Sequence, residues 1–540
     1  FLFGSLQYVH PPGFATGHRD RRQPAGASQR ILILPQAAHR RAIKLLTPFA
    51  QAAPVCHRIG PAKPQGIGPP PERPGCRSGH RRPNARDGHD RRRHEADKRD
   101  RPGGERDDRL VDPARVDMSR RLNVLVQAYA CNPSLGSEEG VGWGWVCAIS
   151  EHHDLHVLTA AYHHDDIESY LEEHPCLRKR VTFHYVPAKK WHYAPTPRWK
   201  RIEDSILKPI MNFAYRLWQR AAYRSARALA EEEAFDLVHV ITYVGFRFPG
   251  AFWKLPMPLV WGPIGGLENT PWRYLPSMGW RGAVMYTGRN ILNILDKWLL
   301  RDPVKAFRKS DGAVIAATSG IRREIRSRYG VDSIVRCEIG MAPDSSPGAL
   351  SERGPDEPLR IAWSGRHIPC KALPLLLDAL SRLPSDMPWE LTVLGAGPLS
   401  DAWREQARSL GLDDRIRWTG RIPRDEAVAR VRASHVMVVT SLYDLTSTVV
   451  VEALAVGLPV ICPDHYGFSD AIDETCGIKV ATDTVGTIRN GVTEAIRRLY
   501  VDEAERRRLA RGAVRRAGRF AWNETGALVS RIYQRQAASG

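Results

Sequence analysis

The sequence predicts an α/β protein with two Rossmann-like, doubly wound domains, and two observations support this prediction. Short apolar and β-branched runs alternate with stretches of helical periodicity, which is the pattern of parallel sheets whose strands are joined by helices. The alternation occurs in two series, separated by the segment Gly340–Pro358, which is rich in Pro, Gly, Ser and acidic residues. We therefore expect two sheets that face a central cleft.

The first series supplies six expected strands. They are Leu122–Ala128, Leu155–Thr159, Val181–Val186, Asp236–Ile241, Leu259–Trp261 and Gly312–Ala317. Helices are expected notably over Ile202–Glu233 and Ile321–Tyr329.

The second series supplies five expected strands. They are Leu359–Ser364, Leu391–Leu394, Ile416–Thr419, His435–Thr440 and Leu458–Cys462, with helical spacers at Leu373–Leu383, Leu399–Ser409 and Asp425–Arg432. The last two strands are expected to be parallel neighbours, and seventeen residues separate them. A parallel crossover needs a dozen or more residues, usually helical. We therefore expect a buried helix over Thr448–Val456, although its β-branched residues favour a strand.

Residues 1–117 differ in composition from the rest of the chain. They hold 23 Lys and Arg against 12 Asp and Glu, with 15 Pro and 12 Gly, and the first Met is Met118. Residues 118–540 carry 56 basic and 47 acidic side chains, so more than half of the formal charge of +20 precedes them. A segment this polar cannot offset its ordering entropy, so we expect a disordered basic leader. A solvated tail, or sequence translated upstream of Met118, explains it better than a nucleic-acid-binding arm, because no aromatic residues are interleaved with its Arg.

Composition excludes several classes of protein. Because the folded part has a net charge of only +9, bulk charge is no argument for nucleic-acid binding. No run of 18 apolar residues could span a bilayer, and Phe1–Ser5 lacks the basic start of a secretory signal. The nine Cys are scattered without a C-x-x-C pair, which argues for reduced thiols and against structural zinc. We expect a cytoplasmic protein.

A glycine-rich segment follows the first expected strand. The run GSEEGVGWGW contains Gly136, Ser137, Gly140 and Gly142. Glycines let backbone amides approach a phosphate or sugar closely, and a following helix start adds positive potential. The spacing G-x-G-x-G is not the dinucleotide fingerprint G-x-G-x-x-G. Two readings stay open, a substrate-binding loop and a flexible loop packed by its two tryptophans.

Two cations follow the strand Leu359–Ser364. Arg366 and Lys371 lie five residues apart, just past the carboxyl end of that strand. This position at the edge of a doubly wound sheet suits a diphosphate leaving group. The alternative is a pair of solvated surface cations.

A third motif surrounds the start of the helix expected over Thr448–Val456. Asp444 precedes the helix, and Glu452 lies about 6 Å along its axis. Between them, hydroxyls and free amides are supplied by Thr446, Ser447, Thr448 and Val449. Two carboxylates that flank free amides can bind hydroxyls on either side of a bound phosphate. Asp444 as a helix-capping acid is the alternative, but Glu452 is the only charge between Asp444 and Asp464 and needs a partner.

Together these residues resemble those of glycosyltransferase family 4, the "glycosyl transferases group 1" type, which are nucleotide-sugar-dependent enzymes of the GT-B fold. Asp444-x7-Glu452 before the strand at Pro459-Val460 resembles the family motif E-x7-E, and Gly365-Arg366 with Lys371 resembles its phosphate-binding element. Further matching segments are Leu394–Pro398, Arg415–Gly420 and Phe520–Trp522. The resemblance covers roughly residues 118–540 and is strongest in the second half.

The resemblance implies a function and a division of the chain. The protein would move a sugar, most simply a hexose, from a nucleotide-diphosphate sugar to a saccharide or lipid-linked saccharide. Transfer would proceed with retention, without a metal ion or other cofactor, in cell-surface polysaccharide or glycoconjugate synthesis. Residues 118–342 would form the acceptor-side domain and 343–515 the donor-binding domain. Residues 516–540 would form a helix that packs back toward the first domain.

The resemblance also implies roles for individual residues. Arg366 and Lys371 would hold the donor diphosphate, and Asp444 would contact hydroxyls of the transferred sugar. The amides of residues 446–449 would contact sugar and phosphate, Glu452 would bind the ribose, and the segment 136–142 would close over the donor.

Two positions depart from the family pattern. Asp444 stands where the motif has Glu and is one methylene shorter. The family's first-domain histidine follows the pattern H-x-H, and His239-Val240-Ile241 offers only its first position. His239 is therefore a candidate for substrate binding, with local hydrogen bonding in a buried strand as the alternative.

Rival functions and a membrane contact stay open. The stretches Ile206–Arg227 and Trp272–Leu300 are aromatic and amphipathic, so they could rest on an anionic bilayer that carries a lipid-linked acceptor. Packing against the sheet is the alternative for both. A GT-B epimerase or hydrolase acting on a nucleotide sugar would share the fold, and a non-enzymatic nucleic-acid or anionic-surface binder would depend on the leader alone.

Overall fold

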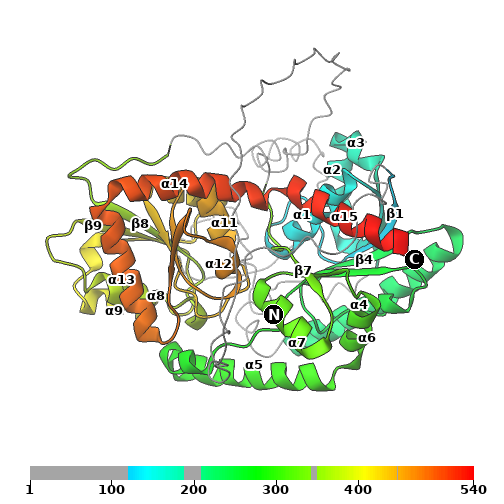
Figure 1. Ribbon diagram of the computed structural model, residues 1–540, viewed down its shortest axis with the longest axis horizontal. Helices are drawn as coiled ribbons and strands as arrows, with labels where there is room; N and C mark the ends of the chain where they lie inside the picture. The colour runs from blue at the N-terminus through cyan, green and yellow to red at the C-terminus, as the bar shows by residue number, and fades with distance from the viewer. Residues whose placement is uncertain (1–119, 188–207, 342–349, 447, 540) are drawn as a thin grey trace, which may run out of the picture. The chain divides into compact units, whose positions relative to one another are not determined.

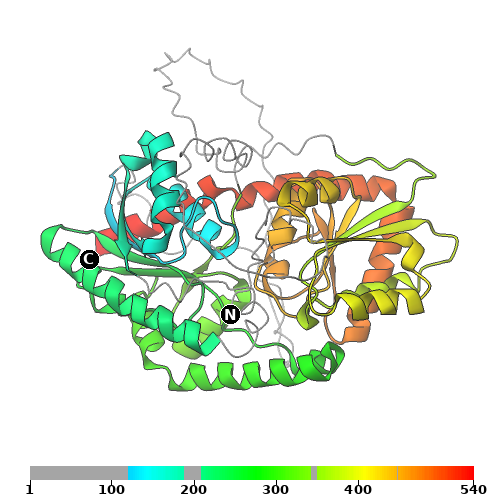
Figure 2. The same ribbon diagram turned by 180° about the vertical axis from the view of Figure 1, so that it is seen from behind.

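The computed structural model describes residues 120–187, 208–341, 350–446 and 448–539. Two separate groups of strands are seen in Figures 1 and 2, each flanked by helices. All pairings between the named strands are parallel, as the alternating pattern predicted. The expected leader, residues 1–117, lies outside the described residues.

The first sheet has seven strands in the order β3-β2-β1-β4-β5-β6-β7. They are β1 Asn123–Ala128, β2 Asp154–Ala160, β3 Val181–Val186, β4 Leu237–Thr242, β5 Leu259–Ile264, β6 Val314–Ala316 and β7 Ser333–Val335. Six of them were expected, and β7 was missed. It is a three-residue strand at the edge of the sheet and lacks an apolar run that would mark it.

The second sheet has six strands in the order β10-β9-β8-β11-β12-β13. They are β8 Leu359–Ser364, β9 Trp389–Leu394, β10 Ile416–Gly420, β11 Val436–Val438, β12 Val460–Pro463 and β13 Gly477–Val480. The missed strand is again an edge strand, β13, which is short and half-exposed in its middle. The central strands of both sheets are fully buried, because helices cover both faces.

Fifteen α-helices lie in the described ranges. In the first half they are α1 Ser137–Ser150, α2 His164–Glu173, α3 Pro175–Arg178, α4 Lys208–Glu232, α5 Gly279–Leu299, α6 Arg301–Lys309 and α7 Ser319–Tyr329. In the second half they are α8 Leu373–Leu380, α9 Ser400–Ser409, α10 Arg424–Arg432, α11 Thr448–Ala455, α12 Tyr466–Ala471, α13 Val485–Val501, α14 Glu503–Ala517 and α15 Trp522–Ser539. The helix expected from the crossover argument is α11. Across the described ranges, no helix combines the length and the apolar character needed to cross a membrane.

The glycine-rich segment is helix α1, so the expectation of a loop there was wrong. Its glycines allow close packing instead. A Cβ at Gly142 would lie 1.9 Å from the carbonyl oxygen of Ala130, and one at Gly144 would lie 2.2 Å from the ring of Trp522. Each glycine in a helix lowers the stability of that helix by about 1 kcal/mol relative to Ala. Here the missing side chain allows a close contact that no larger residue could make. Gly136 alone stays outside, as the N-cap.

The C-terminal helix α15 packs against the first sheet. Its Tyr533 hydroxyl lies 2.6 Å from His239 Nδ1 of β4, and its Ser530 hydroxyl lies 3.0 Å from His153 Nε2. On the way to α15, the chain pairs with the strand-like segment that leads from the first sheet to the second. The Met341 amide donates to Phe520 O at 2.9 Å, and the Trp522 amide donates to Met341 O at 3.0 Å. The chain crosses between the sheets twice, at the segment around Met341 and at the segment around Ala521, and these two crossings are hydrogen-bonded to each other.

Replacing Gly142 by Ala should destabilise the protein. The added methyl meets backbone that cannot rotate away, so we expect Gly142→Ala to lower the free energy of unfolding by about 1–3 kcal/mol. The matched control is Gly288→Ala, also in a helix, where nothing lies within 4 Å of the added Cβ. It should raise stability by up to about 1 kcal/mol. Urea unfolding followed by circular dichroism measures both, and an unchanged stability of Gly142→Ala would contradict this packing.

Candidate functional site

The candidate site lies at the carboxyl edge of the second sheet. Strands β8 and β11 are parallel neighbours, with Ile361 opposite Val436, so the segments that follow them emerge side by side. Lys371 follows β8 and Asp444 follows β11, and the Lys371 ammonium forms an ion pair with an oxygen of the Asp444 carboxylate. The sequence predicted both residues for the site, and the structure brings them into direct contact.

The backbone around Lys371 fixes the position of its side chain. Lys371 ends the short 3-10 helix Pro369–Lys371, and the next residue, Ala372, has a left-handed φ of 47°. Two bonds anchor this turn to the segment after β11. The Thr440 hydroxyl donates to Lys371 O at 2.8 Å, and the Leu442 amide donates to Cys370 O at 2.7 Å. The turn and the loop that carries Asp444 are therefore one unit.

Opposing influences set the charge of Lys371. Burial lowers the pKa of its ammonium, the neighbouring Asp444 carboxylate raises it, and the net shift is upward. Arg366 is close enough to oppose this rise. Lys371 is thus held charged, with the predicted second cation nearby.

The glycine after β9 permits close approach to the Arg366 segment. Gly395 has a φ of 116°, and a Cβ there would lie 2.1 Å from the carbonyl oxygen of Gly365. Only glycine fits such a conformation at such a distance. The run Leu394–Pro398 noted in the sequence therefore shapes the loop that holds Arg366.

Glu452 has the partner that its isolation in an apolar helix required. Its Oε1 accepts from Nη2 of Arg424, at the start of α10, at 2.6 Å. Burial raises the pKa of Glu452, and the Arg424 charge offsets part of that rise. The carboxylate lies in the second turn of α11, and its side chain is partly exposed.

The residues between Asp444 and Glu452 differ in their availability. The Thr446 amide already donates to Glu338 Oε1 at 3.3 Å, and Thr446 is buried, so the prediction of a free amide at this position was wrong. Ser447 lies outside the described residues. Thr448 and Val449 form the first turn of α11, whose amides have no partner within the helix. The open part of the predicted anion site is therefore this first turn.

Two carboxyl groups, the half-buried Glu138 and the buried Glu338, were not predicted for the site. Glu138, in the first turn of α1, accepts from the Val244 amide at 3.0 Å, and Glu338, after β7, accepts from Thr446. Burial raises the pKa of Glu138 to about 7 and that of Glu338 to about 8. The charges of Asp444 and Glu138 add to the rise at Glu338, so the three carboxyl groups share one electrostatic environment.

A functional site was indicated by the sequence at one of these two carboxyl groups but not at the other. Glu138 lies inside the glycine-rich segment that the sequence singled out, whose Gly136, Gly140 and Gly142 belong to the helix start and its packing. For Ser137, only the backbone is described. Glu338 lies in the connection between the sheets, where no motif marked it.

His239 does not belong to the site. It lies in the middle of β4 with none of its surface exposed, and its Nε2 is 2.8 Å from Gly262 O while its Nδ1 faces Tyr533. Burial lowers its pKa to about 3, so it is neutral. The alternative of local hydrogen bonding is therefore correct, because a strand residue in the centre of a covered sheet faces a helix rather than the sheet edge.

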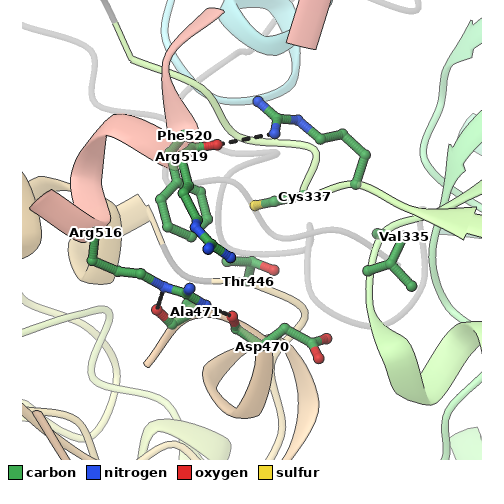
Figure 3. Close-up of a pocket in the computed structure, with 11 residues that line it drawn as sticks. Val335, Cys337, Thr446, Asp470, Ala471, Arg516, Arg519 and Phe520 are labelled. Atoms are coloured by element: carbon green, nitrogen blue, oxygen red, sulfur yellow. Dashed lines mark hydrogen bonds between the residues drawn. The ribbon is translucent and has the colours of Figure 1, made fainter. Parts of the chain in front are cut away.

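A separate cavity lies behind Thr446. It has a volume of about 180 Å³ and is lined by residues of both crossings, among them Cys337, Arg516 and Arg519 (Figure 3). Arg516 donates to Asp470 O at 2.5 Å and to Ala471 O at 2.9 Å, and both bonds are drawn in Figure 3. Ligand pockets usually measure about 300–1,000 Å³, so this cavity is too small for a nucleotide sugar. Neither Lys371 nor Asp444 lines it.

Comparison with known proteins finds similarity to glycosyltransferases. Residues 351–516 match the family model described as "Glycosyl transferases group 1". The chain is 28% identical over 247 residues to a D-inositol 3-phosphate glycosyltransferase of Kineococcus radiotolerans, covering 41% of this chain and 57% of that one. It is 32% identical over 191 residues to the protein of the same description in Salinispora tropica, covering 33% of this chain and 39% of that one. The chain thus spans about half the length of these relatives.

Solved structures establish the fold. The sucrose-phosphate synthase from Thermosynechococcus elongatus aligns with a TM-score of 0.52 at 17% identity, over 78% of this chain and 100% of that one. A glycosyltransferase from Rickettsia africae aligns with a TM-score of 0.51 at 13% identity, again over 78% and 100%. The chain has the GT-B fold, as the sequence resemblance predicted.

The stability of the protein should depend on pH through Glu338. The folded pKa of about 8 lies above the ordinary 4.5, so the native state keeps a proton that the unfolded chain releases. Its contribution is complete below the ordinary pKa and is lost as the pH rises toward 8, by roughly 1.4 kcal/mol for each step of one in pH between these two values. Glu338→Gln keeps an acceptor for Thr446 but cannot titrate. The difference in unfolding free energy between wild type and this variant should therefore change between pH 5 and pH 8, measured by urea unfolding.

A control variant separates this effect from general titration. Glu405→Gln, on the exposed surface of α9, should follow the wild-type profile across the same range. Parallel profiles of wild type and Glu338→Gln would contradict a protonated Glu338.

Proposed function

We propose that the protein is a retaining, metal-independent glycosyltransferase of family 4 that moves a sugar from a nucleotide-diphosphate sugar to a saccharide or lipid-linked saccharide. The observation that carries the proposal is the ion pair of Lys371 with Asp444 at the carboxyl edge of the second sheet, beside the start of α11. The reaction would serve cell-surface polysaccharide or glycoconjugate synthesis at the cytoplasmic face of a membrane. The two relatives are named for D-inositol 3-phosphate, which is a cyclic polyol phosphate rather than a saccharide.

The cations suit a departing diphosphate. Lys371 and Arg366 place positive charge at one point of the sheet edge, and the first turn of α11 adds amides that point away from the helix. Preorganised charge at the position where negative charge develops lowers the barrier to bond cleavage without reorganisation. The leaving group could therefore be stabilised by side chains and a helix start.

The carboxyl groups divide into two kinds. Asp444 is paired with Lys371 and would accept hydrogen bonds from hydroxyls of the transferred sugar, while Glu452, paired with Arg424, would bind the ribose. Glu338, with a pKa of about 8, is largely protonated at neutral pH, and Glu138, with a pKa of about 7, is about half protonated. As neutral groups they would not repel a diphosphate, although they lie in the same electrostatic environment as Asp444.

A nucleotide sugar should stabilise the wild-type protein. In a thermal-shift screen of UDP-, GDP- and ADP-sugars, we expect one donor to raise the melting temperature by a few degrees, since saturating ligand adds about 3 kcal/mol at a hundredfold excess over Kd. Glu452→Gln should lose most of this shift. Glu405→Gln, which alters an exposed carboxylate on α9, should keep it. No shift with any nucleotide sugar in a cooperatively unfolding protein would count against the donor assignment.

Lys371→Met should lower turnover strongly while the fold is kept. Removing one group that stabilises developing charge typically costs about 10²–10³ in kcat. The measurement follows a radiolabelled sugar from the donor into the saccharide or lipid fraction. Arg408→Gln, an exposed cation on α9, is the matched control and should transfer at the wild-type rate.

The same assay separates the rival activities. Label recovered as free sugar would indicate a hydrolase, and label that stays in an altered nucleotide sugar would indicate an epimerase. Either result would replace the transferase proposal.

A further inference from the structure

Helix α5 is inverted relative to an ordinary surface helix, because polar side chains face the protein and apolar ones face solvent. Asn290 bonds both the amide and the carbonyl of Thr270, at 3.0 and 2.7 Å. Asn293 donates to Leu267 O at 3.0 Å, and the buried Lys297 pairs with Glu324 at 2.7 Å. The second half of the inward face is therefore fixed by hydrogen bonds and an ion pair, while Ala283 and Tyr286 in the first half pack on the apolar core of the second sheet.

The outward face is mostly apolar, and Arg281 is the exposed charged residue of α5 on this side. We define the α5 apolar face as Trp280, Val284, Met285, Ile291, Leu292, Ile294, Leu295, Trp298 and Leu299, all of which are exposed. Trp280, Trp298 and Leu299 are 74%, 75% and 71% exposed. At about 100° per residue these positions cover roughly half of the helix circumference along its whole length. A contiguous apolar surface of this kind marks an interaction site.

Cations lie against both ends of this face and indicate the partner: Arg281 is 5.2 Å from the ring centre of Trp280, and Arg328 of α7 is 4.5 Å from that of Trp298. Between Trp272 and Lys309 the chain carries eight Lys and Arg against two acids, Asp296 and Asp302. Asp296 is already paired with Arg247. The exposed cations of this stretch are Arg273, Arg281, Arg301, Lys305, Arg308 and Lys309. A second copy of the chain on a two-fold axis would bring these like charges together, whereas an anionic lipid surface would neutralise them.

We propose that the α5 apolar face lies in the headgroup–acyl boundary of an anionic bilayer. Trp280 and Trp298 mark the two ends of the helix, and indole rings favour this boundary because they join a large apolar surface to one N–H donor. A helix that lies in the membrane plane, with apolar residues below and cations at its sides, is the ordinary form of such a contact.

The other amphipathic stretch of the sequence does not join this surface. In α4 the apolar residues Ala214, Tyr215, Trp218, Ala222 and Ala226 are buried against the first sheet. The membrane expectation for Ile206–Arg227 was therefore wrong in its described part, since its apolar side is already covered. Phe213 is an exposed exception.

If the protein has the proposed function, the position of α5 relative to the site favours an acceptor that is anchored in the membrane. Arg289, on the inward side of α5, bonds the hydroxyl of Tyr443 and lies 3.7 Å from its ring centre. Tyr443 precedes Asp444. A helix with its side chains is about 10–12 Å thick, so a bilayer on the outer face would lie about one helix thickness from this residue. An acceptor anchored in the membrane could reach the donor from there.

Sedimentation with vesicles tests the membrane contact. The full chain should bind mixed phosphatidylcholine–phosphatidylglycerol vesicles at low salt and pure phosphatidylcholine vesicles much more weakly. Trp280→Ser/Trp298→Ser should weaken binding about tenfold or more, since two interfacial anchors are lost. Phe213→Ser on α4 and Val501→Ser on α13 remove exposed apolar side chains elsewhere and should bind as wild type. The test uses neither donor nor acceptor, so its failure is distinct from failure of sugar transfer.

A second readout separates α5 from the basic leader. None of the 15 tryptophans precedes Trp143, so the leader cannot report on lipid by fluorescence. Lipids brominated in the acyl chains should quench the wild type and should quench Trp280→Phe/Trp298→Phe far less. The proposal is wrong if anionic vesicles leave wild type in the supernatant, if the double serine variant binds equally, or if no quenching occurs. It is also wrong if light scattering shows a dimer that the double serine variant converts to a monomer, since a second copy would then cover the face.

Discussion

Every pairing between the named strands of the two sheets is parallel, and this constraint decides where the charged side chains of the site can lie. Parallel strands end at one edge of a sheet, and each connection returns through a helix before the next strand begins. Lys371 and Asp444 are 73 residues apart in sequence, yet they follow the neighbouring strands β8 and β11 and therefore meet. Glu138 follows β1 and Glu338 follows β7 in the same way. The parallel direction of the strands thus determines which charged residues meet at the site.

Removal from water then decides which of these groups keep their charge. Burial raises the pKa of Glu138 and Glu338 to about 7 and 8, and within the described ranges no Lys or Arg forms an ion pair with either of them. Lys371 stays charged because Asp444 offsets the cost of its burial. Such a pair adds little net stability, since desolvation consumes most of the Coulomb attraction. Its effect is positional, and it holds an ammonium where an incoming diphosphate could compete with Asp444 for it.

The sequence predicted the structure correctly where the hydrophobic periodicity and the spacing between strands allow only one structure. Alternation identified eleven of the thirteen strands, and the crossover argument placed α11 against its β-branched composition. The two missed strands are short edge strands that bury few side chains. In the site, spacing pointed to Lys371, Asp444 and Glu452, but it could not show that Glu338 occupies the Thr446 amide, because that contact joins segments 108 residues apart. The glycines of α1 were misread as a loop for the same reason, since the surfaces they approach are remote in sequence.

Helix α5 shows why periodicity alone cannot assign the face of an amphipathic helix. Both α4 and α5 alternate apolar and polar residues with the helical period. They differ in the residues against which each helix packs. The polar side of α5 forms hydrogen bonds with Thr270 and Leu267 and an ion pair with Glu324. The apolar side of α4 packs on the core of the first sheet instead. An inward polar face leaves the apolar face outward by geometry. Since the same helix places Arg289 on Tyr443 beside Asp444, a surface that binds the outer face of α5 also bears on the segment that carries the site.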